Sequence, residues 1–237
     1  MNIQFPLHTA IWIVLNMGVL GVLVVYSFHQ SLSRLEISPA LKRRWLVTVI
    51  VSLIAWFVIR LVLAHGRIVG PARLVQLSQI VVCSAVGLAT ALSSIFRRAV
   101  LSIPQEKLIG FQVVRVAGFV FLALLDMGLL PAQFALPAGY GDIIAGLTAP
   151  LALYALNHSK RYGRGLAIAW NLFGLLDFAV ALATGMLFIA PHVRHLAQTG
   201  HSIAYLDYVL MIPGFAVPIL ILMHIDSLHG LRKRKEA

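Results

Sequence analysis

Charged side chains inside long apolar runs are the residues of this sequence that could carry chemistry. They are the aspartates and arginines Asp126, Asp142, Asp177, Asp207, Arg60 and Arg115. Placing an ionisable group in hydrocarbon costs at least about 2.5–3.5 kcal/mol of insertion free energy. Each of these residues must therefore pair with an opposite charge, contact water or serve the function of the protein. Acids and bases at this depth are typical of sites that bind or relay a proton, an ion or a small polar solute.

Asp177 is the acid with the highest expected cost, because it lies well inside its apolar run, near the middle of a membrane. Arg115, in another run at a similar depth, is its expected partner. Arg115 and Asp126 would share a face of a continuous α-helix, about 16 Å apart along its axis. The Arg115–Asp177 pair is then either a structural ion pair or part of a hydrated cavity in which the acid titrates or binds a ligand.

The remaining charges are expected toward the outer end of the bundle, where Asp126, Asp142, Asp207 and Arg60 could form one polar cluster. Asp142 and Asp207 have a simpler alternative, because an acid in the first turn of a helix is stabilised by about 0.3–1 kcal/mol. Asp126 instead falls near the C-terminal end of its helix, where the dipole disfavours an anion. It therefore needs a partner such as Arg60, or a bound proton.

Histidines raise the alternative of a metal or haem protein. His192 and His195 are three residues apart and could share a helical face, so with His201 or Asp207 they could hold a divalent metal. A membrane haem needs two buried histidines on facing helices, and only His224 clearly qualifies. We therefore expect no metal and no cofactor, and keep the three outer histidines as the metal alternative.

Composition places these residues in a membrane protein. The chain is 60% hydrophobic and 11% charged, with a mean hydropathy of +0.91, whereas soluble domains are about 45–50% apolar and about 25% charged. The predicted fold is one all-α domain over residues 1–237, a bundle of seven transmembrane helices. The predicted spans are about 8–28, 45–64, 74–96, 108–130, 139–157, 165–190 and 205–226. The single cysteine, Cys83, excludes an intrachain disulfide.

The distribution of Lys and Arg predicts the orientation of these helices. Basic residues gather in alternate loops, around 34–44, 97–107, 160–164 and 232–235, and these loops share one side. The positive-inside rule then places the N-terminus outside and the C-terminus in the cytoplasm of a multi-pass protein in a bacterial-type cytoplasmic membrane. The net charge of +11 follows these loops, so we expect no nucleic acid partner.

Three of the predicted spans carry residues that would shape the bundle. The fifth and seventh contain glycines and prolines that could kink or break a helix, namely Gly139, Gly141, Gly146, Pro150, Pro213, Gly214 and Pro218. The third has a stripe of small and polar residues, which predicts a central position in the bundle. Its members are Gln76, Gln79, Cys83, Gly87, Thr90 and Ser94.

Three functions remain open at this point, and the first is favoured. It is a channel or transporter-like protein that handles a proton, an ion or a small polar solute through Asp177, Arg115 and Asp126. The second is an accessory or sensory protein whose buried charges are structural, with a membrane protein or further copies of itself as partner. The third is a membrane-embedded, metal- or haem-dependent enzyme that uses outer histidines and aspartates. The lipid bilayer is a partner in every case.

Overall fold

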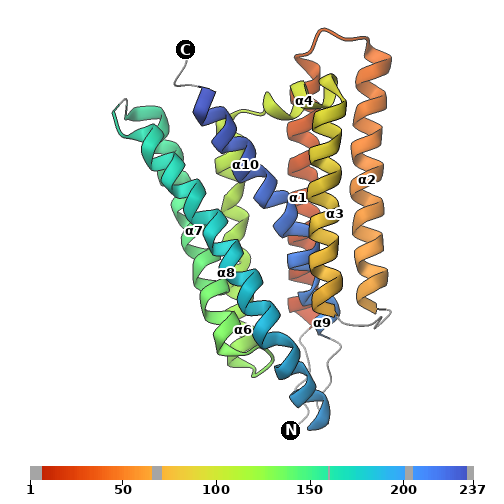
Figure 1. Cartoon of the computed structure of the whole chain (residues 1–237), viewed down its shortest axis with the longest axis vertical. Coiled ribbons are helices and arrows are strands. Elements are labelled where there is room, and N and C mark those ends of the chain that lie inside the picture. The colour runs from red at the N-terminus through yellow and green to blue at the C-terminus, as the bar shows by residue number, and fades with distance from the viewer. Residues whose placement is uncertain (1–6, 66–70, 160, 201–204, 234–237) are drawn as a thin grey trace.

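The computed structural model is a bundle of long helices, as the sequence predicts (Figure 1). It describes residues 7–65, 71–159, 161–200 and 205–233, without the side chains of 63–65, 71–78, 207 and 233. Within these residues, six helices are long and apolar enough to cross a membrane, or seven if one bent pair counts as a single span. The predicted all-α, multi-pass architecture is thus supported, and the count of seven depends on that pair.

The helices follow the predicted spans closely but extend past most of them. The first two are α1 (Leu7–Ser33) and α2 (Pro39–His65), and the third run forms α3 (Pro71–Leu92) and α4 (Ser94–Leu101). The fourth forms α5 (Gln105–Gly110), η1 (Phe111–Gly118) and α6 (Phe119–Asp126). Then come α7 (Ala132–His158), α8 (Gly163–Gln198), and, for the seventh, α9 (Leu206–Val209), η2 (Ile212–Ala216) and α10 (Val217–Lys233).

The third run is bent rather than continuous. The axes of α3 and α4 meet at 112° across a break at Ser93. Ser93 has an extended backbone, and its hydroxyl accepts a hydrogen bond of 3.2 Å from the backbone N–H of Phe96, which caps α4. A single straight span over 74–96 is therefore wrong at its C-terminal end.

The fourth run changes helix type in its middle. The segment η1 is a 3₁₀-helix, in which residues three apart lie on one line along the axis, and its buried residues are Gln112, Arg115 and Gly118. A 3₁₀-helix turns about 20° more per residue than an α-helix. The prediction that Arg115 and Asp126 share one face assumed a continuous α-helix and is wrong, since Arg115 is buried and Asp126 exposed.

The seventh run is broken at the predicted Pro213 and Gly214, where η2 is a short π-helix. Pro213 lacks an N–H, so one backbone hydrogen bond of this turn is missing, whereas Gly214 N still donates to Leu210 O (3.1 Å). Side chains of neighbouring helices contact carbonyls here: Arg60 Nη2 donates to Leu210 O (2.9 Å) and Gln79 Nε2 donates to Pro213 O (2.5 Å). The fifth run differs, because α7 continues through Pro137 and Pro150 as one α-helix.

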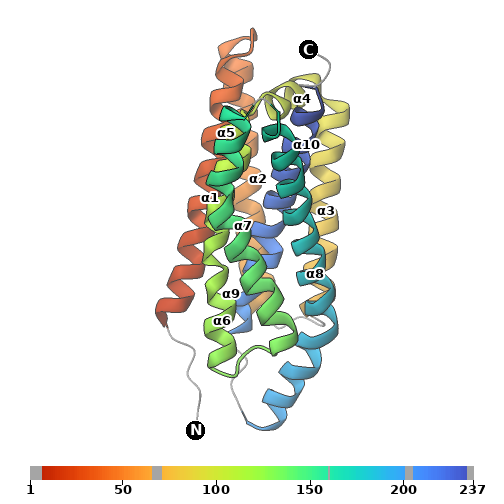
Figure 2. The same ribbon diagram turned by 90° about the vertical axis from the view of Figure 1, so that its left-hand side faces the viewer.

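The bundle has two sides with α10 between them (Figures 1 and 2). On one side α7 and α8 form a hairpin that packs against η1 and α6, and on the other lie α1, α2 and α3. From Gln79 onward, where its side chains are described, α3 buries only Gln79. The predicted central position of the third helix is therefore wrong. The helix α8 has 36 residues, about 54 Å, and exceeds a hydrocarbon thickness of about 30 Å.

The start of α1 and the end of α10 lie at opposite ends of the bundle, as an odd number of crossings requires (Figure 1). The orientation itself can be tested by cysteine labelling in a Cys83→Ser background. Ser102 and Gln198 are both exposed and lie in loops predicted to be on opposite sides. In intact spheroplasts, a membrane-impermeant maleimide should label Gln198→Cys, whereas Ser102→Cys should react only after lysis. The reverse pattern would invert the orientation.

Candidate functional site

The guanidinium of Arg115 is the centre of a buried cluster of polar side chains. Its Nε donates to Asp142 Oδ1 (2.8 Å), its Nη2 donates to Asp177 Oδ2, and its Nη1 lies 3.1 Å from His224 Nε2. The ring of Phe178 lies 4.0 Å from the guanidinium carbon, within range of a cation–π contact. The predicted Arg115–Asp177 contact is present, and Asp142 joins it as a second carboxylate.

Each member of this cluster comes from a different crossing of the bundle. Arg115 lies in η1, Asp142 in α7, Asp177 in α8 and His224 in α10. The Arg115 side chain is fully buried, and those of Asp142 and Asp177 are 15% and 6% exposed. A planar guanidinium with donors in fixed directions suits this role, because it binds several acceptors at once. One side chain therefore joins four spans.

A chain of hydrogen bonds continues from Arg115 through three further buried side chains. His224 Nδ1 lies 2.8 Å from Asn171 Oδ1, Asn171 Nδ2 donates to Ser227 Oγ (3.0 Å), and Ser227 donates to Gln105 Oε1 (2.6 Å). The Arg115 N–H needs an acceptor, so the network assigns a lone pair to His224 Nε2 and the proton to Nδ1. The chain ends at Gln105, the first residue of α5, beside a predicted cytoplasmic loop.

Glycines leave the space in which the cluster fits. A Cβ on Gly118 would overlap Asp142, and one on Gly141 would overlap the carboxylate of Asp177. A Cβ on Gly174 would overlap the His224 ring and approach Arg115 Nη1 to 2.9 Å. Absence of a side chain at these positions allows the backbones of η1, α7 and α8 to approach the charged groups closely.

The charges of the cluster do not cancel when both acids are ionised. Arg115 contributes one positive charge and Asp142 and Asp177 contribute two negative charges, while the assigned tautomer of His224 is neutral. The ionised cluster then has one excess negative charge inside the bundle. Such a charge in hydrocarbon is expensive, so a bound proton or cation lowers its free energy.

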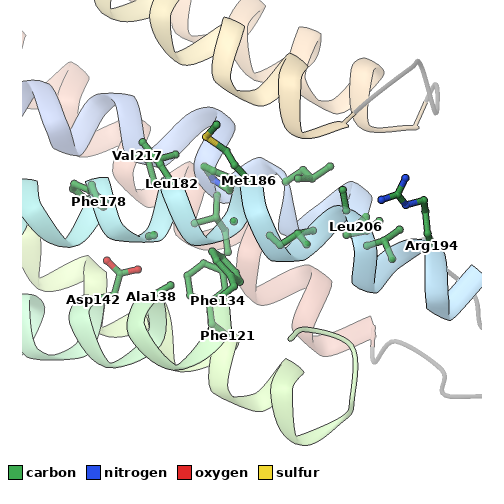
Figure 3. Close-up of a pocket in the computed structure, with 18 residues that line it drawn as sticks. Phe121, Phe134, Ala138, Asp142, Phe178, Leu182, Met186, Arg194, Leu206 and Val217 are labelled. Carbon is green, nitrogen blue, oxygen red and sulfur yellow. The ribbon is translucent and has the colours of Figure 1, made fainter. Parts of the chain in front are cut away.

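A cavity of about 430 Å³ reaches this cluster from one side (Figure 3). It lies between α8 and the segment from α9 to α10, with α6 and α7 as its floor. Asp142 lies at one end and Arg194 at the other (Figure 3). All its other lining residues are apolar, including Phe121, Phe134 and Met186.

Of the other predicted site residues, Asp126 and Arg60 lie outside the Arg115 cluster. Asp126 is exposed at the C-terminal end of α6. Arg60 is buried and donates to the carbonyl of Leu210, and no ion pair joins Arg60 to Asp126. The side chain of Asp207 lies outside the described part of the structure. A single outer cluster of Asp126, Asp142 and Arg60 therefore does not form, because Asp142 points to Arg115 instead.

Two of the histidines kept as the metal alternative, His192 and His195, lie near the end of α8. His192 Nε2 is 3.1 Å from the carbonyl oxygen of Gly128, and His195 is exposed. His201 lies outside the described residues. Among the residues that are described, no group of three or more His, Cys, Asp or Glu side chains could hold a metal ion.

Sequence reasoning missed most of the uncharged members of the network. His224 was considered for haem only, and Asn171, Ser227 and Gln105 were not singled out. A signal was present for Asn171, a polar residue inside the sixth apolar run, whereas Ser227 falls just past the seventh; the structure buries both fully. Polar side chains in hydrocarbon need hydrogen-bond partners on other helices, so each such residue predicts a contact with a neighbouring helix.

The close approach at Gly174 predicts a measurable cost for a single methyl group. Gly174→Ala should lower the free energy of unfolding by about 1–3 kcal/mol, because the new Cβ overlaps His224 and crowds Arg115. Gly165→Ala in the same helix is the matched control, since a Cβ there meets nothing within 4 Å. Alanine should stabilise that position by up to about 1 kcal/mol. Thermal unfolding of both variants in one detergent would measure the difference, and equal midpoints would contradict the packing argument.

Comparison with known proteins gives a family but no assigned activity. No curated protein and no solved structure matches the chain. Residues 72–232, from α3 to the end of α10, match the family described as "Domain of unknown function (DUF8737)". The matched region contains every member of the Arg115 cluster and covers well over half of the chain. The protein therefore belongs to the DUF8737 family.

Proposed function

We propose that this protein is a transporter-like membrane protein that binds and relays a proton at the carboxylates of Asp142 and Asp177. The observation that supports this most is the charge balance of the cluster. Two carboxylates share one guanidinium, and their side chains are 15% and 6% exposed. One proton neutralises the cluster, and intramembrane acids of this kind are characteristic of proton relays.

A proton suits this site better than a hydrated ion or a polar solute. The glycines at 118, 141 and 174 have neighbouring side chains within contact distance of an added methyl group, so the cluster has little free volume. The adjoining cavity has an apolar lining apart from Asp142 and Arg194. A hydrated cation would lose its water there without replacement ligands, whereas a proton needs no cavity of its own.

Proton binding would change the contacts that hold the four spans together. The titratable and charged groups that face each other here are Arg115, Asp142, Asp177 and His224. A proton on either carboxyl group replaces a charged pair with a weaker neutral hydrogen bond. The hairpin of α7 and α8 supplies both acids, so its charged contact with Arg115 of η1 would weaken in that state.

The network beyond Arg115 offers a direction for the relay. Its hydrogen bonds run through His224, Asn171 and Ser227 to Gln105. We assign this series of hydrogen bonds to the predicted cytoplasmic side of the proton path. At the predicted outer end, Asp126 is exposed. Together with Arg60 and Asp207, it belongs to the proposed outer part of the path.

A second function is supported by how completely the guanidinium is bound. Nε, Nη1 and Nη2 of Arg115 each have a partner, and Phe178 covers the plane of the group. A fully paired, buried arginine can be purely structural. The protein would then be an accessory or sensory membrane protein whose cluster fixes the arrangement of its helices for a partner.

Proton flux in liposomes tests the first function. Purified protein should dissipate an imposed pH gradient faster than protein-free liposomes. Asp177→Asn and Asp142→Asn should remove that increment, because each takes away a carboxylate of the pair. Glu106→Gln is the matched control: Glu106 is exposed at the start of α5, and its loss should leave the flux unchanged. Transport should be abandoned if the wild type shows no flux or if Asp177→Asn matches it.

Arg115→Gln tests the buried ion pairs, and flux together with co-purification separates the two functions. Removing one partner of a buried ion pair costs about 3–5 kcal/mol, so thermal unfolding should occur at a markedly lower temperature in either case. Under the structural function, the wild type should lack flux and should co-purify with a membrane partner in a fixed ratio. Flux in the wild type without such a partner would rule against it.

A further inference from the structure

The cavity beside the Arg115 cluster has features of a binding site that the proton relay does not use. Its volume of about 430 Å³ is within the usual range of small-molecule sites, about 300–1,000 Å³. It follows α8 from Phe178 to Arg194, sixteen residues or about 24 Å along the helix axis. Met186, which lines it, is 53% exposed, so the cavity reaches the surface of the bundle.

Arg194 gives this cavity a charged end (Figure 3). Its side chain is exposed, and in the described part of the structure no ion pair or hydrogen bond joins it to another residue. It lies four residues beyond the predicted apolar run, where lipid headgroups are expected. The predicted outer side is otherwise poor in bases, which makes an arginine at this place notable.

The shape and charge of the cavity together indicate an amphiphile. Between its two charged ends the lining is entirely apolar, so no polar group would fix a peptide or a sugar. The aliphatic and aromatic side chains of Phe134, Leu182 and Met186 suit a hydrocarbon chain (Figure 3). A guanidinium at headgroup depth suits a phosphate, which it can bind through two parallel hydrogen bonds.

We infer that this cavity binds one acyl chain of an anionic phospholipid from the bilayer, with the lipid phosphate on Arg194. The chain enters beside Met186 and lies along α8 toward Phe178, covering the open side of the Asp142 carboxylate. The bound lipid fills the space between the α7–α8 hairpin and the segment from α9 to α10. This site is independent of whether the protein relays protons.

Native mass spectrometry with dioleoyl phosphatidylglycerol as the probe tests the assignment. The wild type should retain one phosphatidylglycerol at detergent concentrations that remove phosphatidylcholine. Arg194→Gln should weaken that retention roughly tenfold, because a charge-assisted hydrogen bond is lost. Gly185→Leu, in the wall of the cavity, should weaken retention of both lipids by filling the space of the chain. Arg161→Gln, an exposed arginine outside the cavity, is the matched control and should behave as the wild type.

The outcomes separate this site from the alternatives. Equal retention by the wild type and Arg194→Gln overturns the assignment, as does a second copy or another protein bound in place of the lipid. Arg194 is exposed, so its substitution should not disturb folding even if Gly185→Leu does. A loss of lipid in Arg194→Gln supports the lipid site whether or not the wild type conducts protons. The lipid site and the proton relay can therefore fail separately.

Discussion

The structure depends on one constraint: a buried arginine, Arg115, needs hydrogen-bond acceptors for its guanidinium where water cannot supply them. Arg115 presents its donors in fixed directions, and the bundle meets them with two carboxylates, an imidazole nitrogen and an aromatic face. These partners come from α7, α8 and α10, so the guanidinium fixes the mutual positions of η1 and these three helices. Apolar side chains facing lipid cannot do this, because the hydrophobic effect does not distinguish one helix contact from another inside a bilayer.

Several local irregularities can be understood from this requirement. The 3₁₀ turn of η1 aligns Gln112, Arg115 and Gly118 on one buried line. Gln112 Nε2 donates to Leu220 O (3.1 Å), so the same line of residues also contacts α10. Gly141 and Gly174 leave room for the acid and the histidine that Arg115 binds. One face of the irregular backbone of η1 is therefore buried against protein, where side chains of other helices can supply hydrogen-bond partners.

The sequence was sufficient to predict where most of the long helices lie, because apolar length reflects the thickness of the bilayer, but it did not predict the bend at Ser93. It also predicted that Asp177 would pair with Arg115, since a charge near the midplane needs an opposite charge at the same depth. It did not predict that Asp142 completes the same cluster. That contact depends on the close approach of α7 to η1 at Gly118. It also depends on the 3₁₀ segment, which points its side chains in directions that a continuous α-helix would not give.

The cavity and the cluster share one polar residue, Asp142. Asp142 is the more exposed of the two acids, with 15% of its side chain accessible against 6% for Asp177, and it faces the cavity. Water in that cavity would hydrate the ionised carboxylate and reduce the need for a neutralising proton. A hydrocarbon chain in the same space would keep the carboxylate dry and favour the neutral cluster. An occupant of the cavity would therefore control proton binding at Asp142 without touching Arg115. The hydration of the Asp142 carboxylate is what differs between the water-filled and the lipid-filled cavity.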